Sequence, residues 1–182
     1  MNGAVNSEAA AMDDLRPALA HDFRDPGLLA QALTHSSVAG TDRAGAKRAP
    51  DYERLEFLGD RALGLAVADW LLELFPDEKE GLLAKRFAGH VRREALAEVA
   101  RRLDLGRHLR LSPGEEQMGG RENDTILADA CEAVIGALFL DGGFDAARRF
   151  VRTHWAARIR EAGGPPAEAK TALQEWAQGR GL

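Results

Sequence analysis

Two short stretches of the sequence carry carboxylates at helical spacing. The first, "ERLEFLGD", places Glu53, Glu56 and Asp60 on one face of a helix that turns by about 100° per residue. The second, "TILADACEAVIGALFL", places Asp129 and Glu132 three residues apart among apolar neighbours, with no Lys or Arg within four residues of either. A carboxylate on a largely buried helix is costly unless it is paired or binds a metal. The pattern therefore predicts that the two helices face each other and hold a cation.

The donor atoms indicate which cation this is. Glu56, Asp60, Asp129 and Glu132 offer hard oxygen ligands without His or Cys, which suits Mg²⁺ or Mn²⁺ rather than zinc. Such ions hold phosphate oxygens and activate water, so phosphoryl-transfer chemistry is expected. The alternative is two solvated helix faces. That interpretation is the simpler one for either stretch alone, but it explains the pair poorly because the second helix is so apolar.

The elements that must position these carboxylates are helices. Apolar residues recur with a helical period and no segment alternates as a strand does, so an all-α fold is predicted. From the helix with the first acidic stretch, Leu55, Leu58, Ala62 and Leu65 are expected to face the core. Gly142 and Gly143 are expected to end the helix that carries the second acidic stretch. The expected helices span residues 26–33, 51–75, 82–103, 124–141 and 144–163, with loops at 38–50 and 105–123 and a short helix at 170–182.

Composition limits the class of protein. A chain of 182 residues suffices for one domain with a core, and with 6% aromatic residues that core must consist mainly of Leu, Ala and Val. No apolar run reaches the roughly 18 residues of a membrane span, and the N-terminus lacks the features of a signal peptide. The single Cys131 excludes an internal disulfide, so we expect a cytoplasmic protein with no membrane partner. Cys131, Trp70 and Trp155 are expected in the core, and His35 in a turn or cap.

Charge is distributed unevenly along the chain. The net charge of −5 argues, taken alone, against a nucleic-acid binder. The segment 85–110 nevertheless carries eight Lys and Arg residues against three acidic ones. Lys85, Arg86, Arg92 and Arg93 are therefore candidate phosphate contacts, and a solvated helix face is the alternative.

The sequence resembles the catalytic domain of the ribonuclease III family. "ERLEFLGD" (53–60) and "TILADACEAVIGALFLD" (125–141) match its two signature motifs in order and spacing, and "THSS", "FPDEKEGLLAKR" and "LGRHLRLSPGE" look like their counterparts. The resemblance covers residues 22–162. It implies a homodimeric, all-helical endonuclease that cleaves both strands of double-stranded RNA with Mg²⁺, for which Mn²⁺ can substitute. The products would carry 5′-phosphate and 3′-hydroxyl ends with short 3′ overhangs, as in the processing of rRNA precursors and mRNA.

The resemblance also assigns roles to individual residues. Glu56, Asp60, Asp129 and Glu132 look like the metal cluster, with Asp60 and Glu132 as the catalytic pair and a metal-bound water as nucleophile. It further implies that Glu53 and Glu80 are additional acidic residues at the rim of the catalytic valley. Phe57 would insert its ring into the partner subunit, and Gln174 would contact RNA. Tyr52 departs from the pattern, since many bacterial members carry Asn at this position.

The same resemblance divides the chain into segments. It implies the catalytic domain at 13–162 and, at 170–182, the truncated first helix of a double-stranded-RNA-binding domain. The residues themselves predict a disordered N-terminus at 1–12 and a linker at 163–169.

Two other functions fit part of the pattern. An all-α, Mg²⁺-dependent nucleoside triphosphate pyrophosphohydrolase also draws carboxylates from two helices, although such enzymes place them closer in sequence than the roughly seventy residues here. A catalytically silent dimer that only binds duplex RNA is the second alternative, but silence predicts lost carboxylates and all four candidate ligands are present.

Overall fold

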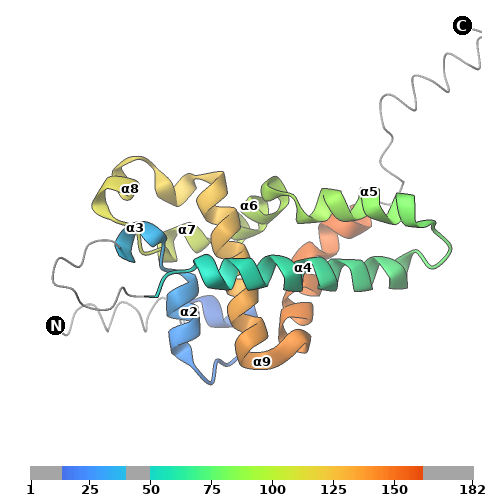
Figure 1. Cartoon of the computed structure of the whole chain (residues 1–182), viewed down its shortest axis with the longest axis horizontal. Coiled ribbons are helices and arrows are strands. Elements are labelled where there is room, and N and C mark those ends of the chain that lie inside the picture. Colours follow the sequence, from blue (N-terminus) through green and yellow to red (C-terminus); the bar gives the residue numbers. More distant parts are fainter. Residues whose placement is uncertain (1–13, 40–49, 162–182) are drawn as a thin grey trace, which may run out of the picture.

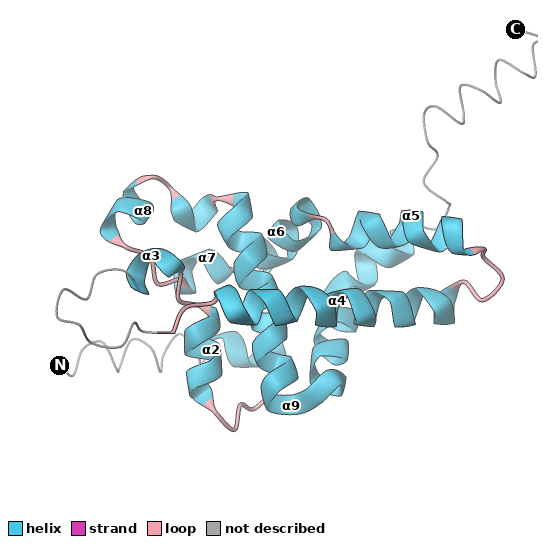
Figure 2. Cartoon of the chain, viewed as in Figure 1, coloured by secondary structure: helices cyan, strands magenta, loops and turns pink. Residues whose placement is uncertain are grey.

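The structure is a computed structural model, and it describes residues 14–39 and 50–161. These residues form helices and loops without a strand, apart from one isolated bridge between Thr34 and Arg110, which confirms the all-α prediction (Figures 1 and 2). Residues 14–19 are helical and precede the other elements. These are α2 (Pro26–Ala32), α3 (Ser36–Ala39), α4 (Glu53–Leu74), α5 (Glu80–Val91), α6 (Arg93–Arg102), α7 (Leu105–His108), α8 (Pro113–Gln117), a 3₁₀ turn (Gly120–Glu122) and α9 (Asp124–Glu161).

Helices α4 and α9 cross at the centre of the molecule (Figure 1). Two glycines let their backbones touch. A Cβ atom on Gly59 would lie 1.7 Å from the carbonyl oxygen of Glu132, and one on Gly136 would lie 2.2 Å from that of Leu55. Any side chain at either position would force the helices apart, since real Cβ atoms do not approach other atoms so closely.

The core lies along this crossing and is built mainly of Leu, Ala and Val, as the composition predicts. Cys131 and Trp155 are fully buried and Trp70 nearly so, which confirms their expected place. Leu65 was predicted to face the core, but 57% of it is exposed. The buried face of α4 instead follows a stripe rotated away from Leu65, formed by Leu55, Gly59, Ala62, Leu63, Ala66, Val67, Trp70 and Leu71.

Two predicted element boundaries were wrong. The single helix expected over 82–103 is two helices, because Arg92 adopts an extended conformation (φ −73°, ψ 153°) between α5 and α6. The expected loop at 105–123 contains α7 and α8. Ser112 caps α8 by accepting a hydrogen bond from the Glu115 N–H, and Pro113 occupies the first turn.

The predicted end of a helix at Gly142–Gly143 is confirmed, since the backbone leaves helical geometry at Gly143 and α9 consists of two helical halves joined by a sharp bend. Gly143 has φ 72°, which favours glycine, and the chain then turns back along the core. Just before the bend, the buried carboxylate of Asp141 accepts hydrogen bonds from the backbone N–H groups of Arg24 and Asp25 and from His21. Burial acts to raise the pKa of Asp141. These hydrogen bonds outweigh the effect of burial and lower the pKa to about 2. This contact fixes the start of α2 against α9. None of the described helices is long and apolar enough to cross a membrane.

Candidate metal centre

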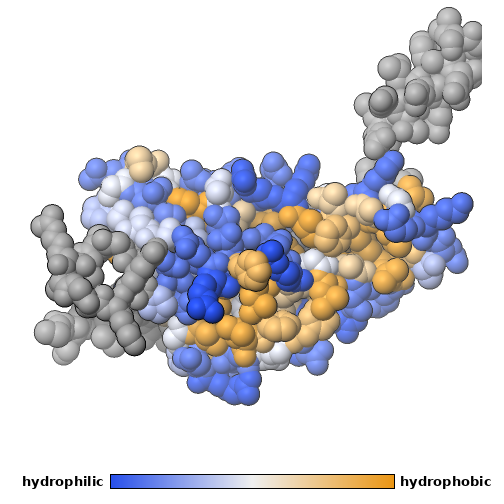
Figure 3. Space-filling model, viewed as in Figure 1, coloured by the Kyte–Doolittle hydropathy of each residue, from blue (hydrophilic) through white to orange (hydrophobic). Residues whose placement is uncertain are grey.

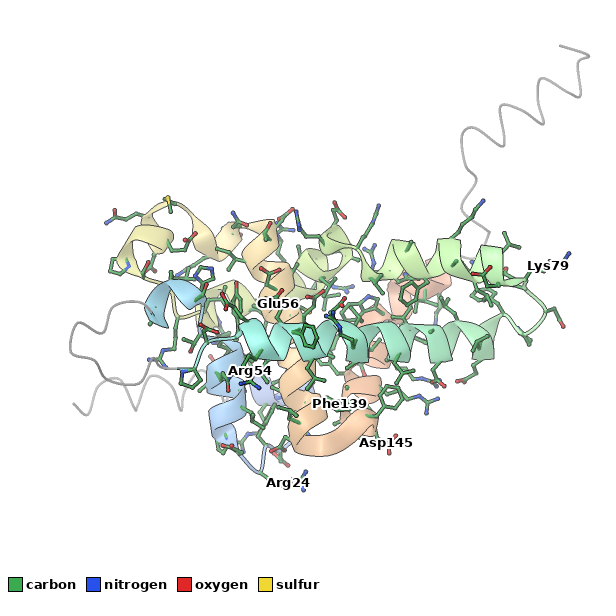
Figure 4. All side chains as sticks on the ribbon, viewed as in Figure 1. Arg24, Arg54, Glu56, Lys79, Phe139 and Asp145 are labelled. Atoms are coloured by element: carbon green, nitrogen blue, oxygen red, sulfur yellow. The ribbon has the colours of Figure 1, made fainter. Side chains whose placement is uncertain are left out.

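Three of the predicted carboxylates meet where α4 crosses the first half of α9. Glu56 comes from α4, and Asp129 and Glu132 come from α9. One carboxylate oxygen of each lies within 4.8 Å of the others, and all three side chains are partly buried. Glu56 is labelled in Figure 4. The sequence prediction that the two helices face each other is therefore confirmed.

Asp60, the fourth predicted ligand, lies one turn further along α4 and outside this group of three. It is exposed, and its carboxylate pairs with Arg61 at 3.1 Å. Its negative charge nevertheless acts on Glu132, whose pKa it helps to raise. Asp60 thus borders the cluster, and its role as a ligand stays a prediction.

The cluster carries more negative charge than its surroundings balance. Burial first, and then the charges of Asp60, Glu56 and Asp129, together raise the pKa of Glu132 to about 8. Burial is also the main cause that raises the pKa of Glu56 and of Asp129. Partly buried carboxylates with raised pKa values are stabilised by a cation. Three oxygen donors without His or Cys fit Mg²⁺ or Mn²⁺.

Tyr52 and His35 border the cluster, and sequence reasoning assigned neither to it. Tyr52 is buried directly before α4; burial raises the pKa of its hydroxyl, and the nearby charge of Asp129 raises it further. The His35 ring lies edge-on to the Tyr52 ring, with centroids 5.4 Å apart. His35 also accepts a hydrogen bond from the Ser37 N–H, in line with its predicted place in a turn. Tyr52 lies 77 residues before Asp129, and no sequence pattern links the two.

The additional acids occupy different places. Glu53 is exposed in the first turn of α4, and its charge helps to raise the pKa of Glu56. Glu80 begins α5, beyond the far end of α4. Its neighbour Lys79 lies at the right-hand end of the molecule in Figure 4, whereas Glu56 lies near the centre. A single chain therefore does not bring Glu80 to the cluster, and its role as an additional acid at the rim stays a prediction.

The candidate phosphate contacts differ in their exposure to solvent. Lys85, Arg92 and Arg93 are exposed. Arg86 is 4% exposed, and its guanidinium makes two hydrogen bonds to Glu78 (2.6 and 2.8 Å) while it stacks on Phe75. The prediction of Arg86 as a phosphate contact is corrected, because this residue holds the α4–α5 turn together instead. Gln174 lies outside the described residues, as do the predicted segments 1–12, 163–169 and 170–182.

The predicted dimer residue Phe57 is 63% exposed, with Arg61 stacked on its ring at 3.8 Å. Phe57, Leu65 and Leu72 form an exposed apolar stripe along α4, and Figure 3 shows extensive apolar surface on this face of the molecule. Beside Phe57 lies a groove lined by Gln31, Pro50, Glu53, Arg54, Leu55, Leu58 and Leu140. An exposed apolar area of this kind is typical of a surface that binds another protein.

Known proteins share both this sequence and this fold. The Ribonuclease-III-like family matches residues 25–159. The chain is 51% identical to ribonuclease 3 of Jannaschia sp. (strain CCS1) over 90% of this chain and 70% of that protein. It is 47% identical to ribonuclease 3 of Rhodopseudomonas palustris over 100% of this chain and 64% of that protein. The chain thus spans about two thirds of the length of these relatives.

Solved structures give the same result. The nuclease domain of ribonuclease III from Campylobacter jejuni superposes with a TM-score of 0.71 at 38% identity, covering 80% of this chain and 99% of that domain. That structure is described for its flexibility in a region involved in dimer formation. A second structure of the same nuclease domain has a TM-score of 0.69 and covers 86% of this chain.

Proposed function

Because this chain belongs to the ribonuclease III family, we propose that it is an endoribonuclease that cleaves both strands of double-stranded RNA with Mg²⁺, or Mn²⁺ in its place. The products would carry 5′-phosphate and 3′-hydroxyl ends with short 3′ overhangs. The observation that carries the proposal is the cluster of Glu56, Asp129 and Glu132, whose carboxylate oxygens converge within 4.8 Å.

Each carboxylate of the cluster has a proposed role. Glu56, Asp129 and Glu132 would hold the cation, and Asp60, on the next turn of α4, would join them as the fourth ligand. When bound, the cation supplies a Lewis acid that activates water and balances charge on the phosphate. Glu132 has the most strongly raised pKa of the described carboxylates, so it gains most from a neighbouring positive charge. We therefore assign Glu132, with Asp60, the central role in catalysis.

A homodimer would give the enzyme two such centres, one for each strand of a duplex. The exposed Phe57 and the apolar stripe along α4 support this assembly, since a lone subunit would leave them in water. The groove beside Phe57 is the place we propose for the partner's aromatic ring. Replacing Phe57 with Ala should then weaken the dimer, and sedimentation over a range of concentrations would measure it.

The substrate is held mainly by its shape and phosphates, because the major groove of A-form RNA is too narrow to be read by side chains. The exposed Lys85, Arg92 and Arg93 remain the candidate phosphate contacts. Arg93 lies close enough to the cluster for its charge to lower the pKa of Asp129 against the effect of burial. We place the reaction in the cytoplasm, in the processing of rRNA precursors and mRNA.

The test is cleavage of a long duplex RNA at low salt, with the product ends analysed on a gel. Wild-type protein should cut with Mg²⁺ and not with EDTA, and Glu132→Gln should lose the activity. Asp145→Asn is the matched control, since Asp145 is an exposed carboxylate on the far side of the α9 bend. If a folded wild-type dimer binds duplex RNA but never cuts it, the chain is a silent relative. Hydrolysis of nucleoside triphosphates instead would favour the pyrophosphohydrolase alternative.

A further inference from the structure

One arginine on α4 contacts both the residue assigned to the dimer and a residue assigned to the metal centre. The central carbon of the Arg61 guanidinium lies 3.8 Å from the centre of the Phe57 ring. One guanidinium nitrogen donates to the Asp60 carboxylate at 3.1 Å and to the Phe57 carbonyl at 2.9 Å. Phe57 is the exposed ring assigned to the partner's groove, and Asp60 is the fourth proposed ligand. A single side chain therefore joins the two.

Formation of the dimer would disturb the stack of Arg61 on Phe57. The ring is 63% exposed and the Arg61 side chain is 58% exposed, so the stack lies in water in the single subunit. Insertion of the ring into the groove of a second copy would either cover the face on which Arg61 lies or bury its charge. Burying a cation is costly unless a carboxylate accompanies it. The two charged residues that line the groove are one base, Arg54, and one acid, Glu53, so the groove offers a cation no net negative charge. We therefore expect the guanidinium to leave the ring.

The cation of the metal centre would compete with Arg61 for the same carboxylate. Asp60 pairs with Arg61, whereas Glu56, one turn earlier on α4, belongs to the cluster. Asp60 can become a ligand only if its carboxylate turns from Arg61 toward the cluster. An exposed ion pair of this kind is weak, so the stack on Phe57 helps to hold the guanidinium beside Asp60. Loss of the stack would thus also release Asp60.

We propose that Arg61 is a positioning residue that couples the dimer to the metal centre. In the single subunit it holds the Asp60 carboxylate beside the Phe57 ring. In the dimer it leaves the ring, and Asp60 turns toward the divalent cation. The proposal rests on the proposed metal-dependent function and its dimer. Coupling of this kind is reciprocal, so the cation must also favour the dimer. We expect an effect of about fivefold, at the lower end of the usual range, because two weak contacts carry it.

The test is sedimentation of the protein without RNA over a range of concentrations, in EDTA and in saturating Mn²⁺. Calorimetry first shows whether Mn²⁺ binds. The dimer of the wild type should have a dissociation constant about fivefold lower in Mn²⁺ than in EDTA. Arg61→Gln removes both the charge beside Asp60 and the stacked cation. Its dimer should have the same dissociation constant in both solutions, because Asp60 is then free in the monomer as well.

Lys79→Gln is the matched control. It also removes one exposed positive charge, but Lys79 lies at the right-hand end of the molecule, away from Glu56 (Figure 4). This variant should keep the response of the wild type. Loss of a nearby charge alone would tighten Mn²⁺ binding in monomer and dimer alike, so the coupling separates the proposed role from a general effect of charge. Melting temperatures in EDTA show that the variants are folded.

Each outcome decides a different point. If the wild type binds no Mn²⁺, the proposed metal-dependent function fails, and if it sediments as a monomer throughout, the proposed dimer fails. The coupling is then wrong as well. If the wild type binds Mn²⁺ and dimerises equally well in both solutions, the coupling is wrong and the function stands. If Arg61→Gln keeps the response to Mn²⁺, or Lys79→Gln also loses it, the role of Arg61 is wrong.

Discussion

Glu132→Gln should make the metal-free protein more stable at alkaline pH, although we expect it to abolish activity. The folded state raises the pKa of Glu132 from its ordinary value of 4.5 to about 8. Between these values the folded protein binds the proton more tightly than the unfolded chain does, so stability falls as the pH rises. Stability that depends on this proton is fully present below pH 4.5 and is lost as the pH passes through 8. A glutamine carries no charge and escapes the loss.

The size of the effect follows from the two pKa values. A difference of about 3.5 between them corresponds to about 5 kcal/mol at full strength. Glu132 is only partly buried, and solvent screening reduces the value, so we expect about 2 kcal/mol. In urea this is a midpoint shift of about 1 M for a chain of this size.

The assay is urea unfolding followed by circular dichroism in EDTA, at pH 4.5 and 8.5 and at one protein concentration. The wild type and Glu132→Gln should unfold together at pH 4.5, and the variant should be the more stable at pH 8.5. Adding Mg²⁺ should stabilise the wild type more than the variant, because the cation balances the charge that the variant lacks. Asp145→Asn should follow the wild type throughout. A wild type that is at least as stable as Glu132→Gln at pH 8.5 in EDTA would refute the reasoning.

Three further predictions concern the scaffold. Gly59→Ala should destabilise the fold by about 3 kcal/mol, because the new Cβ atom would collide with the α9 backbone. Gly64→Ala should be tolerated, because its Cβ atom would meet only a side chain, at 3.4 Å. Thermal unfolding compares the two variants. Arg86→Met should lower the melting temperature by leaving the Glu78 carboxylate unpaired, and RNA affinity measured by fluorescence anisotropy on the folded protein should not change. A lower affinity would restore Arg86 as a phosphate contact. The stability that Asp141 confers should persist down to about pH 4 and be lost as the pH falls toward 2, and acid unfolding of Asp141→Asn should show no such loss.

Local patterns predicted the parts of the fold that they control. The helical period located α2, α4 and α9, and the cost of burying Asp129 and Glu132 predicted that α9 faces a second acidic helix. Ser112 and Pro113 also mark the start of α8, and this signal was available in the sequence but was not used.

Other features depend on contacts between distant segments. The break at Arg92 has no Pro or Gly at that residue to announce it, and it arises where α5 and α6 pack on different parts of the molecule. The close approach of Gly136 to Leu55 joins residues 81 apart in the chain. No local pattern predicts such contacts, because each of the two segments could pack against many other segments of the chain.

The crossing of α4 and α9 also determines when this protein can become an enzyme. Glu56 is synthesised 76 residues before Glu132, and a bacterial ribosome adds about 5 to 20 residues per second. The growing chain therefore carries α4 for roughly 4 to 15 s before its acidic partner exists. During this time the core face of α4 lacks the helix that covers it in the folded chain, while the stripe at Phe57, Leu65 and Leu72 is exposed as it also is in the folded subunit. The catalytic centre is thus completed late in synthesis, and α4 is the segment most in need of protection from premature association.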